Sequence, residues 1–433
     1  MKAKSPRDNF VWILVGAHKE TPGFWVNCFS KSRTGAVAKS AQYAGQLQPA
    51  PIQCLWTVYR AKCPVVDDMV DFAISGEGDT EVSGFRIPYR NADQTRREIV
   101  VCQSRLFAYD KWQLMFAVIE LYRFYGADMI AAYVDSVISE AFQFLTVYKE
   151  QGFVAIHPAV RYEEIGRLDY DPNKETEYYQ QISAYNLCLL EYRESTDFLI
   201  FGDWDEVLVP RNASTLFEEL SIMLAEYPKA AAFRYQRMHV QNYLPKQASF
   251  FDLGDFLNST RSMDKFGASK VVAVGDRVES VGIHRIAWAN APFEEVMLTT
   301  EYSMFLHFRE RGKRTCDNEE VAGLLPTLNT TELAENFTQF VDDHNLYPTY
   351  VNLPTDLVHA DSLLECYWNL SQTLGHPEWG ICPNHLYCPR PKLPYPVQCT
   401  YMKLDFARFK FKEDIVMSYP KRTSFEVRWD GCL

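Results

Sequence analysis

Apolar runs alternate with helical segments between residues 99 and 202, and this alternation limits the possible folds more than any other feature of the chain. The runs that read as buried strands are 99–102, 129–134, 153–157 and 198–202. The segments with helical spacing are 106–125, 139–150 and 182–193, and Gly126 and Gly152 supply helix stops. Consecutive strand–helix–strand units predict an α/β domain with a mostly parallel sheet flanked by helices.

An acidic motif, Asp203-Trp204-Asp205-Glu206, follows the last of these strands directly. In extended backbone, Asp203 and Asp205 can face one side while Trp204 packs on the other. Ligands of open α/β sheets bind beyond the carboxyl ends of the strands. Two carboxylates there suit magnesium or manganese, which keep open positions for phosphate oxygens. The motif predicts a metal and diphosphate site, and an acidic helix cap or strand end is the alternative interpretation.

Composition narrows the class of protein. A net charge of −12 argues against a nucleic-acid-binding protein, because such surfaces need clustered Lys and Arg. Hydrophobic residues form 47% and charged residues 23% of the chain, as in folded globular proteins. A length of 433 residues exceeds what one hydrophobic core usually serves, so we expect two or three structural units.

We divide the chain into three parts. Strand-like runs predict an N-terminal β-rich domain over residues 1–95, and the α/β pattern predicts a catalytic domain over 96–310. The Cys- and Pro-rich remainder, 311–433, is predicted to be an irregular extension packed on the catalytic domain. The strand-like runs of the first part are 10–17, 52–60 and 82–87.

Eleven cysteines are many for a cytosolic enzyme and favour an oxidising compartment. Cys366, Cys382, Cys388 and Cys399 crowd an irregular stretch, where we expect disulfides rather than zinc because Cys382 and Cys388 lack the close spacing of zinc-binding pairs. Cys188, within a helical pattern, is interpreted as a buried thiol.

Five Asn-X-Ser/Thr sequons add to this signal for a secreted glycoprotein, although single sequons are weak evidence. They stand at Asn212, Asn258, Asn329, Asn336 and Asn369. The apolar run at 10–17 is too short to span a bilayer, so we expect any membrane anchor to be absent from this chain.

Several separated blocks resemble glycosyltransferase family 92, a family of inverting GT-A enzymes that includes galactosyltransferases. In order, they are Val101–Trp112, Glu120–Asp128, Tyr148–Gly152, Asp203–Glu206 and Phe305–Arg309, with a weaker similarity at Val11–Glu20. The resemblance implies a GT-A-type, Rossmann-like fold and a metal-dependent transferase. For the reaction, it implies UDP-galactose as donor, a glycan as acceptor and a β linkage in the product. It also implies a role in N-glycan biosynthesis. The chain would then be the lumenal part of a type II membrane protein of the Golgi.

The resemblance assigns roles to individual residues. Asp203 and Asp205, a DXD motif, would hold Mn²⁺ or Mg²⁺ and the diphosphate. Similar families end the catalytic domain with a metal-ligating histidine, which His307 matches, while His284 is the rival third ligand. Phe308 stands where Tyr is common, which leaves the imidazole ligand unchanged. Asp135 occupies the place where GT-A folds commonly contact uridine.

Four further residues are candidates for the donor site. Gln181 and Asn186 lie on the helix before the acidic motif and could reach the donor, or act as cap or surface residues. Lys270 and Arg309 could neutralise diphosphate oxygens, or be solvated or ion-paired.

The catalytic base and the reaction class stay open in the sequence. An inverting reaction needs a carboxylate base, for which Glu310, Glu279 and Asp276 are candidates. The alternatives are a noncatalytic lumenal glycan-binding protein on the same fold and a glycoside hydrolase. A hydrolase places two carboxylates about 5–10 Å apart across the sugar, and Asp203 and Asp205 are too close in sequence to do so comfortably.

Overall fold

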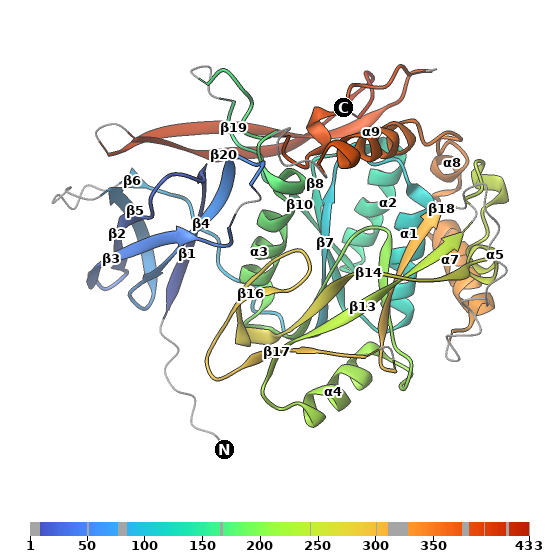
Figure 1. Ribbon diagram of the computed structural model, residues 1–433, viewed down its shortest axis with the longest axis horizontal. Helices are drawn as coiled ribbons and strands as arrows, with labels where there is room; N and C mark the ends of the chain where they lie inside the picture. Colours follow the sequence, from blue (N-terminus) through green and yellow to red (C-terminus); the bar gives the residue numbers. More distant parts are fainter. Residues whose placement is uncertain are drawn as a thin grey trace.

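The structure is a computed structural model in which three parts of the chain are described: an N-terminal sheet, a central α/β body and a long C-terminal hairpin that crosses both (Figure 1). The described residues are 9–49, 52–76, 85–164, 168–242, 244–299, 301–310, 328–374, 381–393, 395–412 and 415–432. Among their helices, none combines the length and the apolar character needed to cross a membrane.

The N-terminal part is an antiparallel six-stranded sheet in the order β1-β4-β3-β2-β5-β6. Its strands are β1 (Phe10–His18), β2 (Phe24–Ser32), β3 (Val37–Gln46), β4 (Trp56–Pro64), β5 (Met69–Gly76) and β6 (Phe85–Arg86). Alternation along β2 buries Val26 and Cys28 and leaves Trp25 exposed, as expected for a strand with one covered face.

The central sheet has nine strands, eight of them in the order β10-β8-β7-β11-β14-β13-β18-β12, with β17 paired to β13. They are β7 (Arg97–Leu106), β8 (Met129–Val134), β10 (Val154–Pro158), β11 (Thr196–Gly202), β12 (Glu206–Val209), β13 (Ala230–Asn242), β14 (Arg261–Val274), β17 (Glu294–Met297) and β18 (Met304–Glu310). The four strands β10, β8, β7 and β11 run parallel, as predicted. The other half is mixed, because β14 is antiparallel to both β11 and β13, and β12 is antiparallel to β18.

Helices cover both faces of this sheet. They are α1 (Trp112–Phe124), α2 (Ser139–Glu150), α3 (Gln181–Tyr192), α4 (Leu216–Glu226), α5 (Leu253–Asn258), α7 (Thr330–Asp343), α8 (Tyr347–Tyr350) and α9 (Val358–Leu374). Alternate residues of β7 divide between two cores: Ile99 and Val101 pack with α1, α2, α4 and α7, whereas Val100 and Cys102 pack with α3. Because both faces are covered, the parallel strands read as continuous apolar runs rather than alternating ones.

Short elements complete the central body. They are β9 (Ser136–Ile138), β15 (Val278–Val281), β16 (Ile286–Ala289) and the 3₁₀ turns η1 (Glu177–Gln180), η2 (Ala248–Phe250), η3 (Gly275–Arg277) and η5 (His385–Tyr387).

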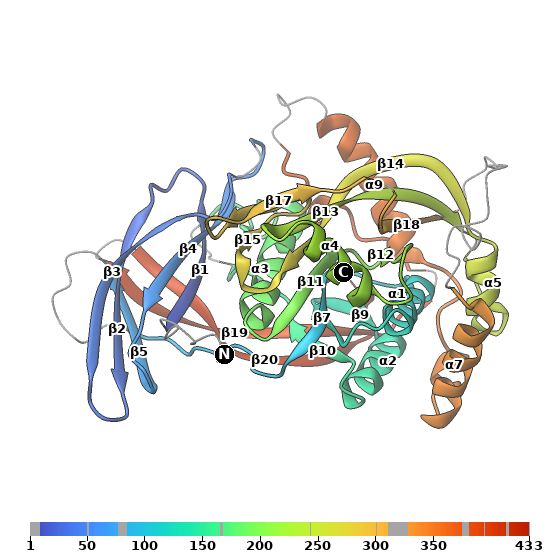
Figure 2. The same ribbon diagram turned by 90° about the horizontal axis from the view of Figure 1, so that it is seen from below.

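The C-terminal hairpin, β19 (Cys399–Lys412) and β20 (Ile415–Arg428), joins the two sheets. The start of β19 pairs with β9 of the central body, and further along Phe409 and Phe411 enter the apolar core of the N-terminal sheet. Figure 2 shows the hairpin running from one part of the molecule to the other. The tail of the chain therefore packs on the N-terminal sheet as well as on the central body.

Five disulfides fasten these parts, which confirms the expectation of disulfides over zinc. They are Cys28–Cys63, Cys54–Cys382, Cys102–Cys188, Cys366–Cys388 and Cys399–Cys432. The interpretation of Cys188 as a free buried thiol is wrong, because its sulfur is bonded to Cys102 and ties α3 to β7. Cys316 lies outside the described residues.

Most predicted elements of the central body match the structure, whereas the N-terminal prediction is incomplete. Strand 129–134 and helix 139–150 coincide with β8 and α2, but the run at 52–60 is displaced by four residues from β4. The strands β2, β3 and β5 were not predicted, since Gly, Ser and Lys interrupt their apolar pattern. The N-terminal sheet ends at Arg86 and β7 begins at Arg97, on either side of the boundary we placed at residue 95.

We expect Phe411→Ala to lower the free energy of unfolding by about 3 kcal/mol, because a buried aromatic ring that bridges the hairpin and the N-terminal sheet leaves a cavity. Phe411 is 4% exposed, whereas Val416 on β20 is 59% exposed and serves as the matched control. Val416→Ala should change the unfolding free energy by less than about 0.5 kcal/mol in urea titrations. Equal effects of the two variants would contradict the bridging role.

Candidate functional site

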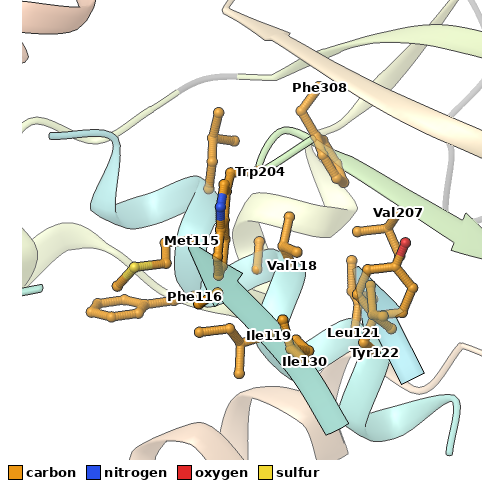
Figure 3. Close-up of a cluster of buried hydrophobic side chains, with 14 of the residues drawn as sticks. Met115, Phe116, Val118, Ile119, Leu121, Tyr122, Ile130, Trp204, Val207 and Phe308 are labelled. Carbon is orange, nitrogen blue, oxygen red and sulfur yellow. The ribbon is translucent and has the colours of Figure 1, made fainter. Parts of the chain in front are cut away.

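The acidic loop is anchored by Trp204, which lies between the two aspartates. Its side chain is 3% exposed, packs in the core that contains Met115 and Val118 of α1, and donates from its indole nitrogen to the Ser104 carbonyl at 2.8 Å (Figure 3). Asp203 and Asp205 keep side-chain exposures of 29% and 28%. Burial of the residue between them therefore presents both carboxylates at the carboxyl end of β11.

Lys270, from β14, lies beneath this loop and pairs with two of its carboxylates. Its ammonium group is 2.7 Å from Asp203 Oδ2 and 3.1 Å from Glu206 Oε2, and both Lys270 and Glu206 are fully buried. Arg237 of β13 contacts the other oxygen, Glu206 Oε1, at 2.5 Å. The two cations thus neutralise Asp203 and Glu206 inside the protein.

The buried charges hold each other in their ionised forms. Burial alone raises the pKa of the Asp203 carboxyl, but Lys270 and the hydrogen bond from Tyr185 hold that pKa below its ordinary value. Burial likewise lowers the pKa of the Lys270 ammonium, and the attraction of Asp203 and Glu206 outweighs it and raises that pKa. The cluster is therefore an ion network rather than a set of neutral acids.

Asp205 differs from its neighbours, because it faces an imidazole. Its Oδ2 lies 3.2 Å from Nε2 of His307 on β18, and its carbonyl accepts a hydrogen bond from the Phe308 amide at 2.8 Å. Burial raises the pKa of the Asp205 carboxyl, whereas His307, Lys111 and Arg309 together bring it below the ordinary value. Of the three carboxylates, Asp205 alone forms no lysine or arginine ion pair within the described part of the chain. Lys270 and Arg237 thus pair with Asp203 and Glu206, whereas Asp205 faces His307, with Lys111 and Arg309 in its surroundings.

Asp205, Glu206 and His307 have ligand atoms within 4.8 Å of one another, which makes this a candidate metal centre. Glu206 is already occupied by Lys270, Arg237 and the Asp203 amide, which donates to Oε2 at 3.1 Å. Asp205 and His307 therefore offer the open ligand atoms. A second group, His359 with Cys399 and Cys432, has its two sulfurs joined in a disulfide and so lacks thiolates.

The first turn of α3 holds the remaining oxygen of Asp203. Gln181 Nε2 and the Tyr185 hydroxyl donate to Asp203 Oδ1 at 2.5 and 3.0 Å. The residues just before this helix, Tyr178 to Gln180, have φ angles of 44°, 49° and 69°, left-handed values that cost side chains other than glycine about 1 kcal/mol each. Such strain concentrates at functional sites, and it fixes where Gln181 enters the cluster.

Asp135, at the end of β8, is held by two arginines. Its carboxylate lies 3.1 Å from both Arg105 and Arg161 and is 1% exposed. Arg105 also lies over the Tyr179 ring, with its guanidinium 3.5 Å from the centroid. Two guanidinium groups against one carboxylate give this group of three side chains a net positive charge.

The other donor-site candidates fall into different places. Asn186 is turned away from the acidic loop, since its amide exchanges hydrogen bonds with the backbone of Val281 at 2.7 and 3.0 Å. The His284 ring pairs with the Ser269 carbonyl at 3.0 Å and does not contact Asp205, whereas His307 does. Lys270 is buried beneath the loop, and Arg309 is exposed beside it.

Two of the three base candidates lie away from the cluster. Asp276 follows β14 at the amino end of β11, about 20 Å from Asp203 by the length of the strand. It lines an open cavity of about 500 Å³ that includes Thr196 and does not reach the acidic loop. Glu279 pairs with Arg60 at 3.2 Å and Lys62 at 3.8 Å of the N-terminal sheet. Glu310 ends β18, and its side chain lies outside what the structure describes.

Several site residues escaped the sequence analysis. Arg237 and His239 lie on β13, which carries no recognisable motif, and the His239 ring is 4.9 Å from that of His307. Gly267 on β14 leaves room for both side chains, because a Cβ there would lie 2.7 Å from Arg237 Nη2 and 2.9 Å from His239 Nε2. The register between strands that are far apart in the sequence brings these residues together. A single sequence carries no local signal for that register.

Similarity to one protein family covers more than half of the chain. The chain matches the model of glycosyltransferase family 92 over residues 97–357. A family 92 protein of Caenorhabditis elegans is 25% identical over 429 residues, which cover 94% of this chain and 81% of that protein. Another from the same organism is 28% identical over 322 residues, or 70% of this chain and 63% of that protein. Among solved structures, the WbbM bifunctional glycosyltransferase aligns with 49% of this chain and 36% of its own at 13% identity and a TM-score of 0.22, which supports no argument.

Replacing Lys270 by Met should lower the free energy of unfolding by about 3–5 kcal/mol, because two carboxylates then lose their buried counter-ion. Lys246, whose side chain is 76% exposed and pairs with Asp356 at 3.4 Å, is the matched control. Lys246→Met should change the unfolding free energy by less than about 0.5 kcal/mol. Urea titrations measure both values. An unchanged free energy of unfolding in Lys270→Met would contradict the ion network.

Proposed function

The chain belongs to glycosyltransferase family 92, and from that membership we propose that it is a metal-dependent inverting glycosyltransferase. The donor we propose is UDP-galactose, the acceptor is a glycan, and the product contains a β-glycosidic bond. The observation that carries the proposal is the contact between Asp205 and His307 at the carboxyl end of β11.

The donor atoms at this position fit a divalent cation. Asp205 Oδ2 and His307 Nε2 lie 3.2 Å apart, and Asp205 forms no ion pair with a described lysine or arginine. Magnesium strongly prefers oxygen ligands, so the imidazole favours manganese of the two ions. When bound, such an ion would stabilise the charge of the departing diphosphate. Asp205 and His307 would hold it, while Asp203, with both oxygens already hydrogen-bonded, would orient the loop.

Cations around the loop support a diphosphate ligand. Lys111 and Arg309 lie close enough to Asp205 to lower its carboxyl pKa, and neither is among the buried ion pairs of the cluster. They would meet the diphosphate oxygens, in the role that the sequence suggested for Arg309. Lys270, suggested for the same role, serves as the internal counter-ion of Asp203 instead.

The end of β8 supports a site for the rest of the nucleotide. Asp135, Arg105 and Arg161 form a group with surplus positive charge beside the first turn of α3. Asp135 would orient the two guanidinium groups, which can donate hydrogen bonds to the ribose or uracil oxygens. Its own carboxylate is occupied by these arginines.

For the base that deprotonates the acceptor hydroxyl, Glu310 stays our candidate. It lies three residues beyond His307 on β18. Asp276 lies at the far end of β11, and Glu279 on β15 is paired with Arg60 of the N-terminal sheet, so neither is placed to reach an acceptor at Asp205.

We propose the Golgi lumen as the working compartment, with this chain as the lumenal part of a type II membrane protein that acts in N-glycan biosynthesis. Five disulfides support an oxidising compartment.

The proposal predicts manganese-dependent UDP release from UDP-galactose in the presence of a glycan acceptor. Asp205→Asn and His307→Ala should each lower kcat/KM by more than about 100-fold, because each removes a ligand atom of the metal. Asp276→Asn, which changes an exposed carboxylate at the far end of β11, should leave the rate within about twofold of the parent rate. A coupled assay of UDP release with a panel of UDP-sugars and glycans measures these rates.

Each alternative gives a distinct outcome. Binding of glycans without UDP release from any UDP-sugar would favour the noncatalytic glycan-binding protein. Release of free sugar from a glycan without a nucleotide donor would favour the hydrolase, for which paired free carboxylates are required. Undiminished turnover in Asp205→Asn would contradict the metal assignment.

A further inference from the structure

Asn258 stands at the last turn of α5, at the start of the sequon Asn258-Ser259-Thr260. Its side chain is exposed, and its Oδ1 accepts a hydrogen bond from the Thr330 hydroxyl at 3.1 Å. Its Nδ2, the atom that carries sugar in N-glycosylated proteins, forms no hydrogen bond with another described residue. The Asn258 side chain is therefore fixed by one oxygen contact while its nitrogen stays available.

A polar groove opens beside this asparagine, between α5 and α7. It has a volume of about 580 Å³, and its walls include Asp252, Asp255, Asn258, Thr331, Glu335 and Gln339. Carboxylate, hydroxyl and amide groups are the partners that neutral sugar hydroxyls need, whereas the acidic side chains disfavour an anion.

The helices meet closely at the floor of the groove. A Cβ on Gly254 would lie 3.0 Å from the Thr330 carbonyl and 3.3 Å from Ala334 Cβ, so two small residues set this approach.

We propose that Asn258 carries an N-linked glycan whose first neutral sugars lie in the groove between α5 and α7. The inference rests on the secretory part of the proposed function, because the modifying enzymes act there. Nδ2 attacks the anomeric carbon of a sugar on a polyprenyl diphosphate, loses one proton, and displaces the diphosphate. The product amide keeps Oδ1 and one N–H, so the contact with Thr330 survives the modification.

The folded structure also implies that the sugar is added before α5 docks. Thr260, the hydroxyl residue of the sequon, is fully buried and donates to the Phe256 carbonyl at 2.8 Å. A transferase that must bind this hydroxyl cannot reach it in the folded protein. Addition therefore precedes the docking of α5, and the groove then closes around a sugar that is already attached.

Asn336 provides a matched control on α7, the other helix of the groove. It begins another sequon, is exposed, and lies on a flank of α7 that does not line the groove. A glycan on Asn336 would start outside the groove, but Gln339 is the i+3 neighbour of Asn336 on α7, so this background tests which glycan Gln339 contacts. The two asparagines therefore lie on the two helices that form the groove, and of the two only Asn258 lines it.

The test uses the full chain, secreted from a eukaryotic host and mapped by mass spectrometry before and after peptide N-glycosidase. We expect Asn258 to carry sugar and to become Asp on enzymatic release. Finding Asn258 unmodified in the secreted protein would overturn the proposal.

Contact between sugar and groove is tested by thermal unfolding of a variant pair. Gln339→Ala should lower Tm by about 2 °C in the glycosylated protein and leave it unchanged in the Asn258→Gln background. In the Asn336→Gln background the full shift should persist. An equal shift in all three backgrounds would overturn the placement of the sugar in the groove.

UDP release, measured on the same preparations, separates this proposal from the proposed function. An active transferase with unmodified Asn258 would overturn the glycan alone. A glycosylated protein that releases no UDP would overturn the transferase and leave the glycan standing.

Discussion

The buried ion pair of Lys270 with Asp203 and Glu206 is the interaction on which the site depends. A lysine taken fully out of water is tolerated only with compensating charge, and here two carboxylates of one short loop supply it. The pair joins β14 to the end of β11, while Asp205 contacts His307 instead of Lys270. One arrangement therefore holds the loop from below and keeps the Asp205 side chain partly exposed above it.

Topology makes this arrangement possible. Because β14 runs antiparallel to β11, the middle of a 14-residue strand passes beside the carboxyl end of the parallel half. Lys270 and, through β13 and β18, Arg237 and His307 then reach the loop from one side, while Gln181 reaches it from the helix face. A sheet parallel throughout would have brought only strand ends to this point.

Around this centre, the rest of the chain acts mainly to hold parts together. The hairpin β19–β20 pairs with the central body at Cys399 and fills the N-terminal core with Phe409 and Phe411. The Cys54–Cys382 disulfide makes a second link between the same regions. Asp110, next to the Lys111 that approaches Asp205, accepts hydrogen bonds from the first turn of α9 at 2.8 and 3.1 Å. The C-terminal part is thereby connected to the edge of the site.

The sequence by itself determined the parallel strands, their helices and the position of the acidic loop, because apolar periodicity and the alternation of side chains along Asp203-Trp204-Asp205 are local properties of the chain. It also indicated disulfides through the number of cysteines, but not their pairing, as Cys188 shows. Only the tertiary structure decided that Lys270 is a counter-ion, that His307 rather than His284 meets Asp205, and that Asp276 lies at the opposite end of β11. These contacts join residues from about 60 to 100 positions apart through strand register, and a long-range register leaves no periodic trace in a single sequence.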